Sequence, residues 1–325
     1  MGIDSIIRSK PVLWKASVSV LMFLRRSTVD AALFIMKGLG WMCEAVGRGA
    51  RLRVLFDHWC DDFYLRRDRS QALAGILKDK VVHLDVGASG GLMPVARKYA
   101  GFLDVILCEP DAEESAALRA KGFVTIDRPL YREPRKVPFF ETKMLEGSSI
   151  YKPLGPYMDF YNSDPAYLDL YRTVKTHEFD CSTIAIELKR LGIPALDFLK
   201  IDTQGAELDI VKGLGDYRPL IIFAELQYLP MYEGCPTAFQ VCDHLYGLGY
   251  IPAFLTSHPT RANCTVWGDG LFMPSWVDPR GVNMILAREE KYIALMMMFG
   301  QIEVLKFVAE KLQLKNRDFI KRQRI

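Results

Sequence analysis

The sequence is poor in the patterns that mark metal-binding or disulfide-bonded proteins. Only seven of its 325 residues are cysteine, and no two of them form a Cys-x-x-Cys pair. Zinc ribbons and small disulfide scaffolds both depend on closely paired cysteines. We therefore expect neither a zinc site nor a disulfide framework. Free thiols fit a reducing, cytoplasmic compartment.

Long hydrophobic runs are also scarce in the amino-terminal part. The first apolar stretch, residues 11–24, contains Lys15 and ends at a pair of arginines. A membrane-spanning helix needs about 20 apolar residues, so this stretch is too short to span. No small-residue cleavage site follows it, and we therefore expect no secretory signal.

A second apolar stretch, residues 27–47, is long enough to span but carries Asp30, Lys37 and Glu44. These three charges are seven residues apart and share one narrow stripe of a helix. Such a helix lies on a membrane surface or packs on the rest of the protein. Residues 1–74 are expected to form a helical, partly apolar extension of either kind.

The sequence has no large excess of charge of either sign, since its net charge is +3, but the charges are unevenly distributed. Residues 1–80 carry 14 basic and 8 acidic side chains, and residues 311–325 carry 6 basic and 1 acidic, which leaves an acidic middle. Basic ends on an acidic centre favour anionic surfaces near the termini and exclude a nucleic-acid groove through the middle. Internal repeats and low-complexity segments are also lacking.

The rest of the sequence is organised around a short apolar run and a glycine-rich turn. Residues 81–86 read Val-Val-His-Leu-Asp-Val, and the next five include Gly87, Gly90 and Gly91. Buried parallel strands are short apolar runs of this kind, and glycines at their carboxyl ends let a ligand approach the backbone. The Gly-x-Gly-x-x-Gly spacing is missing, which disfavours an NAD-dependent oxidoreductase.

From residue 81 onward, apolar runs alternate with helical patterns, which predicts an α/β fold with a parallel sheet. The expected strands are residues 81–86, 104–109, 123–127, 197–202, 220–225, 250–255 and 268–273. Helices are expected at residues 92–99, 111–121, 206–213 and 237–248, with Asp111 as a cap. A further helix ends at Leu191 and is capped by Asp180 or Ser182.

Two segments interrupt or follow this alternation. Residues 128–180 are rich in proline and tyrosine and too long for a bare loop, so we expect a partly helical insertion over the site. Beyond Pro274, helices at 289–299 and 302–312 are broken at Gly300. They could form a hairpin docked on the core, a homo-oligomer face or a membrane contact. The domain prediction is 1–74, 75–275 and 276–325.

Four motifs together resemble the FkbM family of methyltransferases that depend on S-adenosylmethionine (SAM). They are Asp-Val-Gly-Ala-Ser-Gly-Gly at 85–91, Glu-Pro-Asp at 109–111, Gly-Ser-Ser at 147–149 and Leu-Lys-Ile-Asp-Thr-Gln-Gly-Ala-Glu at 199–207. The first is common to most class I methyltransferases, and the last is much more specific. Thr203 and Gln204 depart from the family, where Val-Glu is frequent. The resemblance spans residues 81–273.

This resemblance implies a Rossmann-like sheet of seven strands, the last antiparallel, and SAM as the cofactor. The glycine turn would admit the methionine end, and Glu109 after the second strand would accept two hydrogen bonds from ribose hydroxyls. Asp127, after the third strand, would approach the adenine. The predicted cofactor-binding residues are Asp85, Gly87, Ala88, Ser89, Gly91, Glu109, Asp127 and Ser149.

Asp202 and Glu207 follow Lys200 at the end of the fourth strand, and the resemblance places them beside the acceptor and the methyl group. Asp202 could take a proton from the acceptor, pair with Lys200, or hold a divalent cation with Glu225. Glu225 and the nearby Gln227 could also orient a polar acceptor. Among the histidines, His177 is the best alternative base.

The leading interpretation is a SAM-dependent O-methyltransferase acting on a hydroxyl of a sugar in a glycan or glycolipid, or of another small natural product. One alternative is a membrane-associated, non-catalytic scaffold of the same fold. The NAD-dependent oxidoreductase is the other. We expect a cytoplasmic protein, peripheral on the inner membrane face if its amino-terminal segment binds there.

Overall fold

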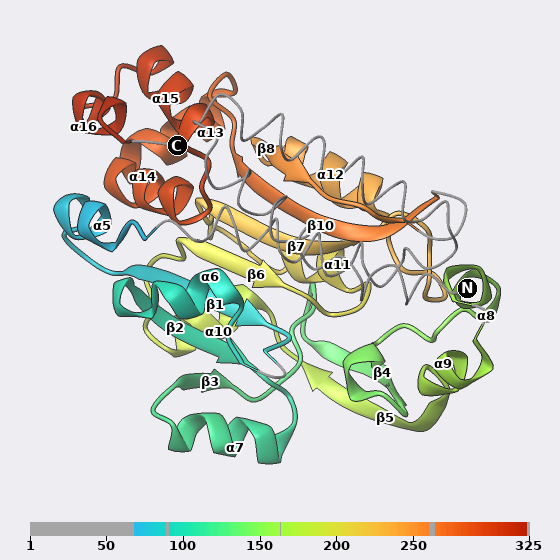
Figure 1. Ribbon diagram of the computed structural model, residues 1–325. Coiled ribbons are helices and arrows are strands. Elements are labelled where there is room, and N and C mark those ends of the chain that lie inside the picture. Colours follow the sequence, from blue (N-terminus) through green and yellow to red (C-terminus); the bar gives the residue numbers. More distant parts are fainter. Residues whose placement is uncertain (1–67, 89–90, 163, 260–263, 324–325) are drawn as a thin grey trace, which may run out of the picture. The chain divides into compact units, whose positions relative to one another are not determined.

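The computed structural model describes residues 68–88, 91–162, 164–259 and 264–323 (Figure 1). The chain divides into two compact units, residues 1–68 and 69–325. The apolar stretches and the charged stripe predicted for the first unit lie outside the described residues, and membrane contact stays a prediction. The helices of the described ranges include none with the length and apolar character needed to cross a membrane.

The second unit is built on a mixed sheet with strand order β3-β2-β1-β6-β7-β10-β8, and β9 pairs with β10. Its strands are β1 (Val81–Val86), β2 (Leu103–Cys108), β3 (Val124–Ile126), β6 (Phe198–Ile201), β7 (Ile221–Gln227), β8 (Tyr250–Leu255), β9 (His258–Pro259) and β10 (Thr265–Pro274). β1, β2, β3, β6 and β7 run parallel, whereas β10 is antiparallel to both β7 and β8. This confirms the expected Rossmann-like sheet with its last strand antiparallel.

Helices connect and cover these strands. The helical segments are α5 (Ser70–Ile76), α6 (Pro94–Lys98), η2 (Ala100–Phe102), α7 (Ala112–Ala120), η3 (Leu145–Gly147), α8 (Gly155–Tyr161), α9 (Pro165–Leu170), α10 (Ile184–Arg190), α11 (Glu207–Lys212), α12 (Ala238–Gly247), α13 (Pro279–Ala287), α14 (Glu289–Met298), α15 (Ile302–Lys311) and α16 (Arg317–Lys321). Asp111 caps α7 as expected, because its side chain accepts from two backbone N–H groups of the first turn.

The cap predicted for α10 is wrong. Thr183, and neither Asp180 nor Ser182, accepts the hydrogen bond from the backbone N–H of Ile186. The reason is that strand β5 continues to Cys181, so Asp180 is part of the strand and lies too far from the first turn of α10 to cap it. The cap is therefore one to three residues later than predicted, because the sequence pattern did not reveal strand β5.

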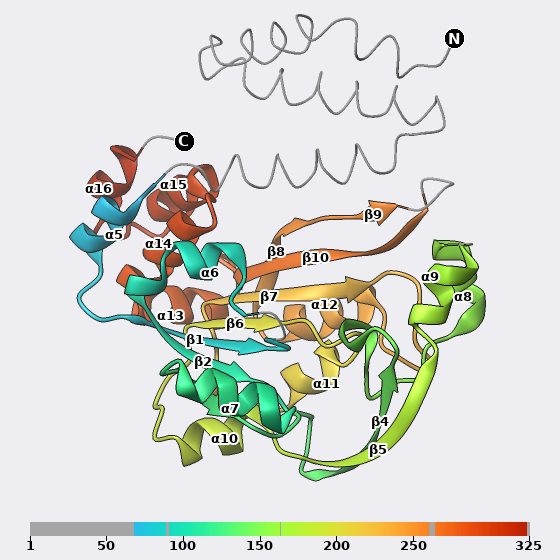
Figure 2. The ribbon, with the colours of Figure 1, turned by 60° about the horizontal axis from the view of Figure 1, so that its bottom comes forward.

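That strand belongs to a two-stranded antiparallel ribbon, β4 (Arg135–Thr142) with β5 (Thr173–Cys181), which frames the insertion between β3 and α10. The expected helices are present as α8 and α9 at the far end of this ribbon. Figures 1 and 2 both show the ribbon and these helices near the carboxyl ends of β1, β6 and β7. The insertion thus stands where a Rossmann-like sheet binds its ligands.

The carboxyl-terminal helices gather at the opposite end of the sheet (Figures 1 and 2). The break at Gly300 separates α14 from α15, as expected, and α13 and α16 flank this pair. α14 is not amphipathic: residues 292–298 are all buried, and the helix packs against α5, α13 and α15. Because a helix buried all round belongs to a core, α14 is an integral part of the second unit.

Candidate active site

The turn after β1 packs directly on the end of β6, and Gly87 makes this approach feasible. Gly87 has a φ of +81°, and a Cβ added there would lie 1.9 Å from the carbonyl oxygen of Asp202. Any side chain would therefore push the two strand ends apart. Gly91 also has a positive φ, of +97°, but an added Cβ there meets nothing within 4 Å. Among the described residues, therefore, nothing crowds the turn at Gly91, while Ser89 lies outside them.

Lys200 joins these strand ends electrostatically. Its Nζ lies 2.9 Å from the carbonyl oxygen of Gly87, 3.1 Å from Asp85 Oδ1 and 3.6 Å from Asp202 Oδ2. Burial by itself lowers the pKa of Lys200, but the charges of Asp85 and Asp202 outweigh it, so the pKa lies above its ordinary value. The side chain is therefore a fixed positive charge between the two carboxylates.

Asp85 is fully buried beside the turn, with spare hydrogen-bonding capacity. Burial raises its pKa to about 6, against the attraction of the Lys200 charge. Its Oδ1 pairs with Lys200 Nζ at 3.1 Å, whereas Oδ2 has no hydrogen-bond partner among the residues that the structure describes. Unpaired buried acceptors are costly, so this carboxylate fits a ligand that donates hydrogen bonds, such as the amino group of SAM. On this point the residues present fit the cofactor.

Glu109 and Asp127 follow the neighbouring strands at the same edge of the sheet. Glu109 is buried. Its backbone N–H donates to the carbonyl oxygen of Ile126, and its Oε1 accepts from the backbone N–H of Asp111 at 3.0 Å. Burial raises its pKa above the ordinary value. Asp127 is exposed and lies 3.4 Å from Arg119. Their predicted contacts with ribose and adenine stay predictions.

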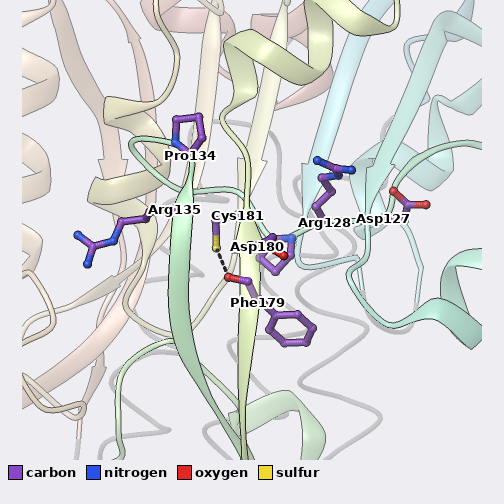
Figure 3. Close-up of a pocket in the computed structure, with 8 residues that line it drawn as sticks. Asp127, Arg128, Pro134, Arg135, Phe179, Asp180 and Cys181 are labelled. Carbon is purple, nitrogen blue, oxygen red and sulfur yellow. Dashed lines mark hydrogen bonds between the residues drawn. The ribbon is translucent and has the colours of Figure 1, made fainter.

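A cavity of about 650 Å³ lies beside Asp127, between the end of β3 and the start of the ribbon (Figure 3). It is lined by Asp127, Arg128, Pro129, Pro134, Arg135, Phe179, Asp180 and Cys181. Asp202 and Lys200 do not line it. The cavity is therefore separate from Asp202 and Lys200 and lies on the side where the adenine contact was predicted.

Ser149 is buried, and its hydroxyl is already engaged. It donates to the carbonyl oxygen of Gln204 at 2.8 Å and accepts from the backbone N–H of Tyr151 at 3.1 Å. Its visible role is thus to fasten the insertion to the loop after β6, and its predicted cofactor contact stays a prediction. Ala88, also predicted to bind the cofactor, is buried next to the glycine turn.

Glu207 is likewise engaged within the chain. Its Oε1 accepts from the backbone N–H and the hydroxyl of Thr203, at 3.0 and 3.1 Å, and from the backbone N–H of Gly205 at 3.2 Å. Burial raises its pKa to about 7, although the backbone hydrogen bonds oppose this. The structure brings Glu207 to the crevice as a carboxylate that holds the 203–205 loop, and its catalytic role stays a prediction.

The side chains of Asp202, Gln204 and Glu225 form a connected group at the ends of β6 and β7. Gln204 Nε2 donates to Asp202 Oδ1 at 3.3 Å and to Glu225 Oε1 at 3.0 Å, and Gln227 Nε2 donates to the same Glu225 oxygen at 3.0 Å. Burial, with the charge of Asp202 as the next cause, raises the pKa of Glu225 well above its ordinary value. The Asp202 side chain remains 41% exposed and faces the crevice.

The sequence analysis did not predict that Gln204 would hold this group together by bonding to both acids. The only signal was its departure from the family motif. Tyr232 was missed as well: its hydroxyl lies 2.9 Å from Gln204 Oε1 and 3.1 Å from the carbonyl oxygen of Gly147. No pattern around Tyr232 predicts this contact, because it joins segments far apart in the sequence.

His177, the alternative base, lies on the ribbon. Its Nε2 is 2.7 Å from Glu141 Oε2 of the facing strand, and its ring stacks near Phe179. Among the described residues, no hydrogen bond joins His177 to Asp202 or Glu225. The structure therefore brings Asp202 and Glu225 together but leaves His177 with a partner of its own.

Comparisons with known proteins bear on this site. A family model described as the methyltransferase FkbM domain matches residues 85–252. No curated protein matches the sequence. Among solved structures, M. capricolum TrmK with S-adenosylhomocysteine (SAH) is similar at 9% identity, covering 79% of this chain and 96% of that one, with a TM-score of 0.33.

A second similar structure is Burkholderia thailandensis 1,6-didemethyltoxoflavin-N1-methyltransferase with 1,6-didemethyltoxoflavin and SAH. It has 13% identity, covers 78% of this chain and 92% of that one, and has a TM-score of 0.28. A third, MtNAS with MTA and tNA, has 9% identity, 80% and 81% coverage and a TM-score of 0.29. Likeness at these scores carries no argument, so the assignment depends on the family model and the topology.

The strand order, the glycine turn after β1 and the acids at neighbouring strand ends define a class I methyltransferase. Since the family model covers more than half of the chain, the chain belongs to the FkbM methyltransferase family. It is a SAM-dependent methyltransferase with SAM as its cofactor. The NAD-dependent oxidoreductase and the non-catalytic scaffold are thereby set aside.

We expect Glu109→Ala to weaken SAM binding by about 2–3 kcal/mol, because two charge-assisted hydrogen bonds to the ribose would be lost. This corresponds to a loss of affinity of about 30- to 150-fold. Calorimetric titration with SAM measures it, with the exposed Glu113→Ala as a matched control. An unchanged affinity in a folded Glu109 variant would remove Glu109 from the site.

Proposed function

We propose that the protein is an O-methyltransferase whose acceptor is a hydroxyl of a sugar, in a glycan or glycolipid, or of another small natural product. The observation that carries this proposal is the half-exposed carboxylate of Asp202, placed at the end of β6 between the buried Lys200 and the amide of Gln204. A hydroxyl is a weak nucleophile until its proton has an acceptor. Asp202 supplies one at the crevice.

When bound, SAM supplies a methyl group on a positively charged sulfur, which is transferred by in-line displacement. The acceptor oxygen bonds to the methyl carbon as the electron pair of the carbon–sulfur bond goes to sulfur. The hydroxyl proton goes to the carboxylate of Asp202. The protein must also hold the acceptor oxygen in line with the methyl–sulfur bond, and well-placed polar side chains do this.

The acceptor side of the crevice carries groups suited to a molecule with several hydroxyls. Glu225 and Gln227 stand at the end of β7, next to Asp202, and can accept from or donate to further hydroxyls. Carboxylates and amides are the side chains that pair with neighbouring hydroxyls of a sugar ring. The acidic middle of the sequence argues against a nucleic-acid acceptor, and SAM is available in the cytoplasm, where we place the reaction.

The test uses pairs of acceptors. Purified protein is incubated with SAM and a panel of glycosides, each matched with an analogue in which one hydroxyl is replaced by an amino group. We expect SAH to form with the hydroxylated member, and mass spectrometry with NMR to locate the new methyl group on oxygen. Methylation only of the amino analogues would contradict the proposal.

A further inference from the structure

Gln204 has an unusual backbone conformation at the centre of the crevice. Its φ is +56°, and among the described residues the only other residue besides glycine with a positive φ is Gln313, whose φ is +50°. Residues with a Cβ are held in this left-handed region only when their surroundings require it, often at functional sites. The cause must therefore lie in the contacts that Gln204 makes.

Those contacts hold both the side chain and the backbone of Gln204. The buried Tyr232 hydroxyl lies 2.9 Å from Gln204 Oε1, and the Ser149 hydroxyl donates to the Gln204 carbonyl oxygen at 2.8 Å. With Oε1 taken by a hydroxyl donor, Nε2 is directed at Asp202 and Glu225. In this orientation the amide presents a donor, and not an oxygen, to the two acids.

Two carboxylates that face one group need a positive or donating partner. Lys200 lies closer to Asp85, at 3.1 Å, than to Asp202, at 3.6 Å, and no ion pair is formed between Lys200 and Glu225. Gln204 Nε2 instead has two hydrogens and lies within 3.3 Å of one oxygen of each acid. In many sites a divalent cation occupies such a position between carboxylates.

We propose that Gln204 is a positioning residue whose amide takes the place of a divalent cation between Asp202 and Glu225. This inference rests on the proposed function, because it leaves Asp202 as a base that works without a metal ion. The amide holds the two carboxyl groups at the ends of β6 and β7 and turns Asp202 toward the crevice. Tyr232 in turn contacts the amide oxygen, and Ser149 holds the backbone of Gln204.

The decisive variant is Gln204→Glu, which keeps the length of the side chain and replaces the donor by a third carboxylate. Cation affinity rises with the number of carboxylate ligands, so this variant should bind Mn²⁺ at least about tenfold more tightly than the wild type. Electron paramagnetic resonance of free Mn²⁺ measures this in the full chain. Gln313→Glu is the matched control, since it makes the same change in the same backbone conformation, in the turn between α15 and α16.

Activity gives a second readout that a merely structural role would not alter. Turnover of the wild type should resist a chelator, whereas turnover of Gln204→Glu should depend on added Mn²⁺. If Gln204→Glu does not fold, as shown by circular dichroism, Gln204→Gly removes the amide and relieves the backbone, and it too should bind Mn²⁺ more tightly than the wild type.

Equal Mn²⁺ binding by the wild type and the variants would overturn the proposal, and so would loss of wild-type turnover on chelation. The Mn²⁺ titration needs no acceptor. It therefore reports on Gln204 even if the acceptor proves not to be a hydroxyl, and a failure of the acceptor test would leave the Mn²⁺ result unaffected.

Discussion

Asp202→Asn should lower turnover by about two to four orders of magnitude, the contribution typical of a positioned proton acceptor, while SAM affinity changes little. The substitution keeps the shape of the side chain and its contact with the Gln204 amide region, but it removes the charge that takes the proton. Steady-state rates with the acceptor and calorimetry with SAM separate the two effects. Lys200 keeps its nearer partner, Asp85, at 3.1 Å, so the fold should persist.

Asp243→Asn is a suitable control, because Asp243 is exposed on α12 and does not line the cavity beside Asp127. Full turnover in the Asp202 variant would show that another group takes the proton. If melting temperature and SAM affinity fall together, Asp202 serves mainly as the structural partner of Lys200. Activation of the wild type by Mg²⁺ or Mn²⁺ would make Asp202 a metal ligand instead.

Asp197→Ala should cost about 3–5 kcal/mol of unfolding free energy, the loss typical of breaking a buried ion pair. Asp197 is fully buried and lies 3.0 Å from Arg288 Nη1 and 2.6 Å from Lys291 Nζ, and it accepts from the backbone N–H of Val82 at 3.0 Å. Removing the carboxylate would leave two largely buried cations without their partner. Urea unfolding of the full chain, followed by circular dichroism, measures the change.

A matched control is Asp104→Ala on the neighbouring strand β2. Asp104 pairs with Lys80 at 3.6 Å, and both side chains are more than half exposed. Exposed ion pairs contribute less than about 1 kcal/mol. A similar loss in both variants would mean that the buried pairs of Asp197 contribute no more than an exposed ion pair and do not anchor α13 and α14 to the sheet.

The sheet could be predicted from the sequence because its strands are buried on both faces. β6, for example, is the continuous run Phe198–Ile201, in which every residue is buried. The ribbon strands could not be found this way. β5 alternates between half-exposed and exposed residues, so it has no apolar face whose period would reveal a strand.

The candidate site was predictable where it depends on strand ends. Asp85 lies near the end of β1, and Glu109 and Asp202 follow β2 and β6. These three parallel strands neighbour one another, so the convergence of the acids follows from topology. The contacts of Gln204 with Glu225 and Tyr232 could not be predicted, because they depend on side-chain orientation across 21 and 28 residues of sequence. The same holds for Glu207, whose carboxylate folds back on its own loop.

The position of β10 has a consequence for synthesis of the chain on the ribosome. β10 is made after β7 and β8, yet it lies between them, so both strands keep unpaired edges until residue 274 has been translated. Arg288, Lys291 and the buried α14 follow later still. At about 5–20 residues per second, this leaves a delay of seconds in which open strand edges can pair with other chains. Until β10 has been made, the facing edges of β7 and β8 are therefore the part of the sheet that is most open to pairing with other chains.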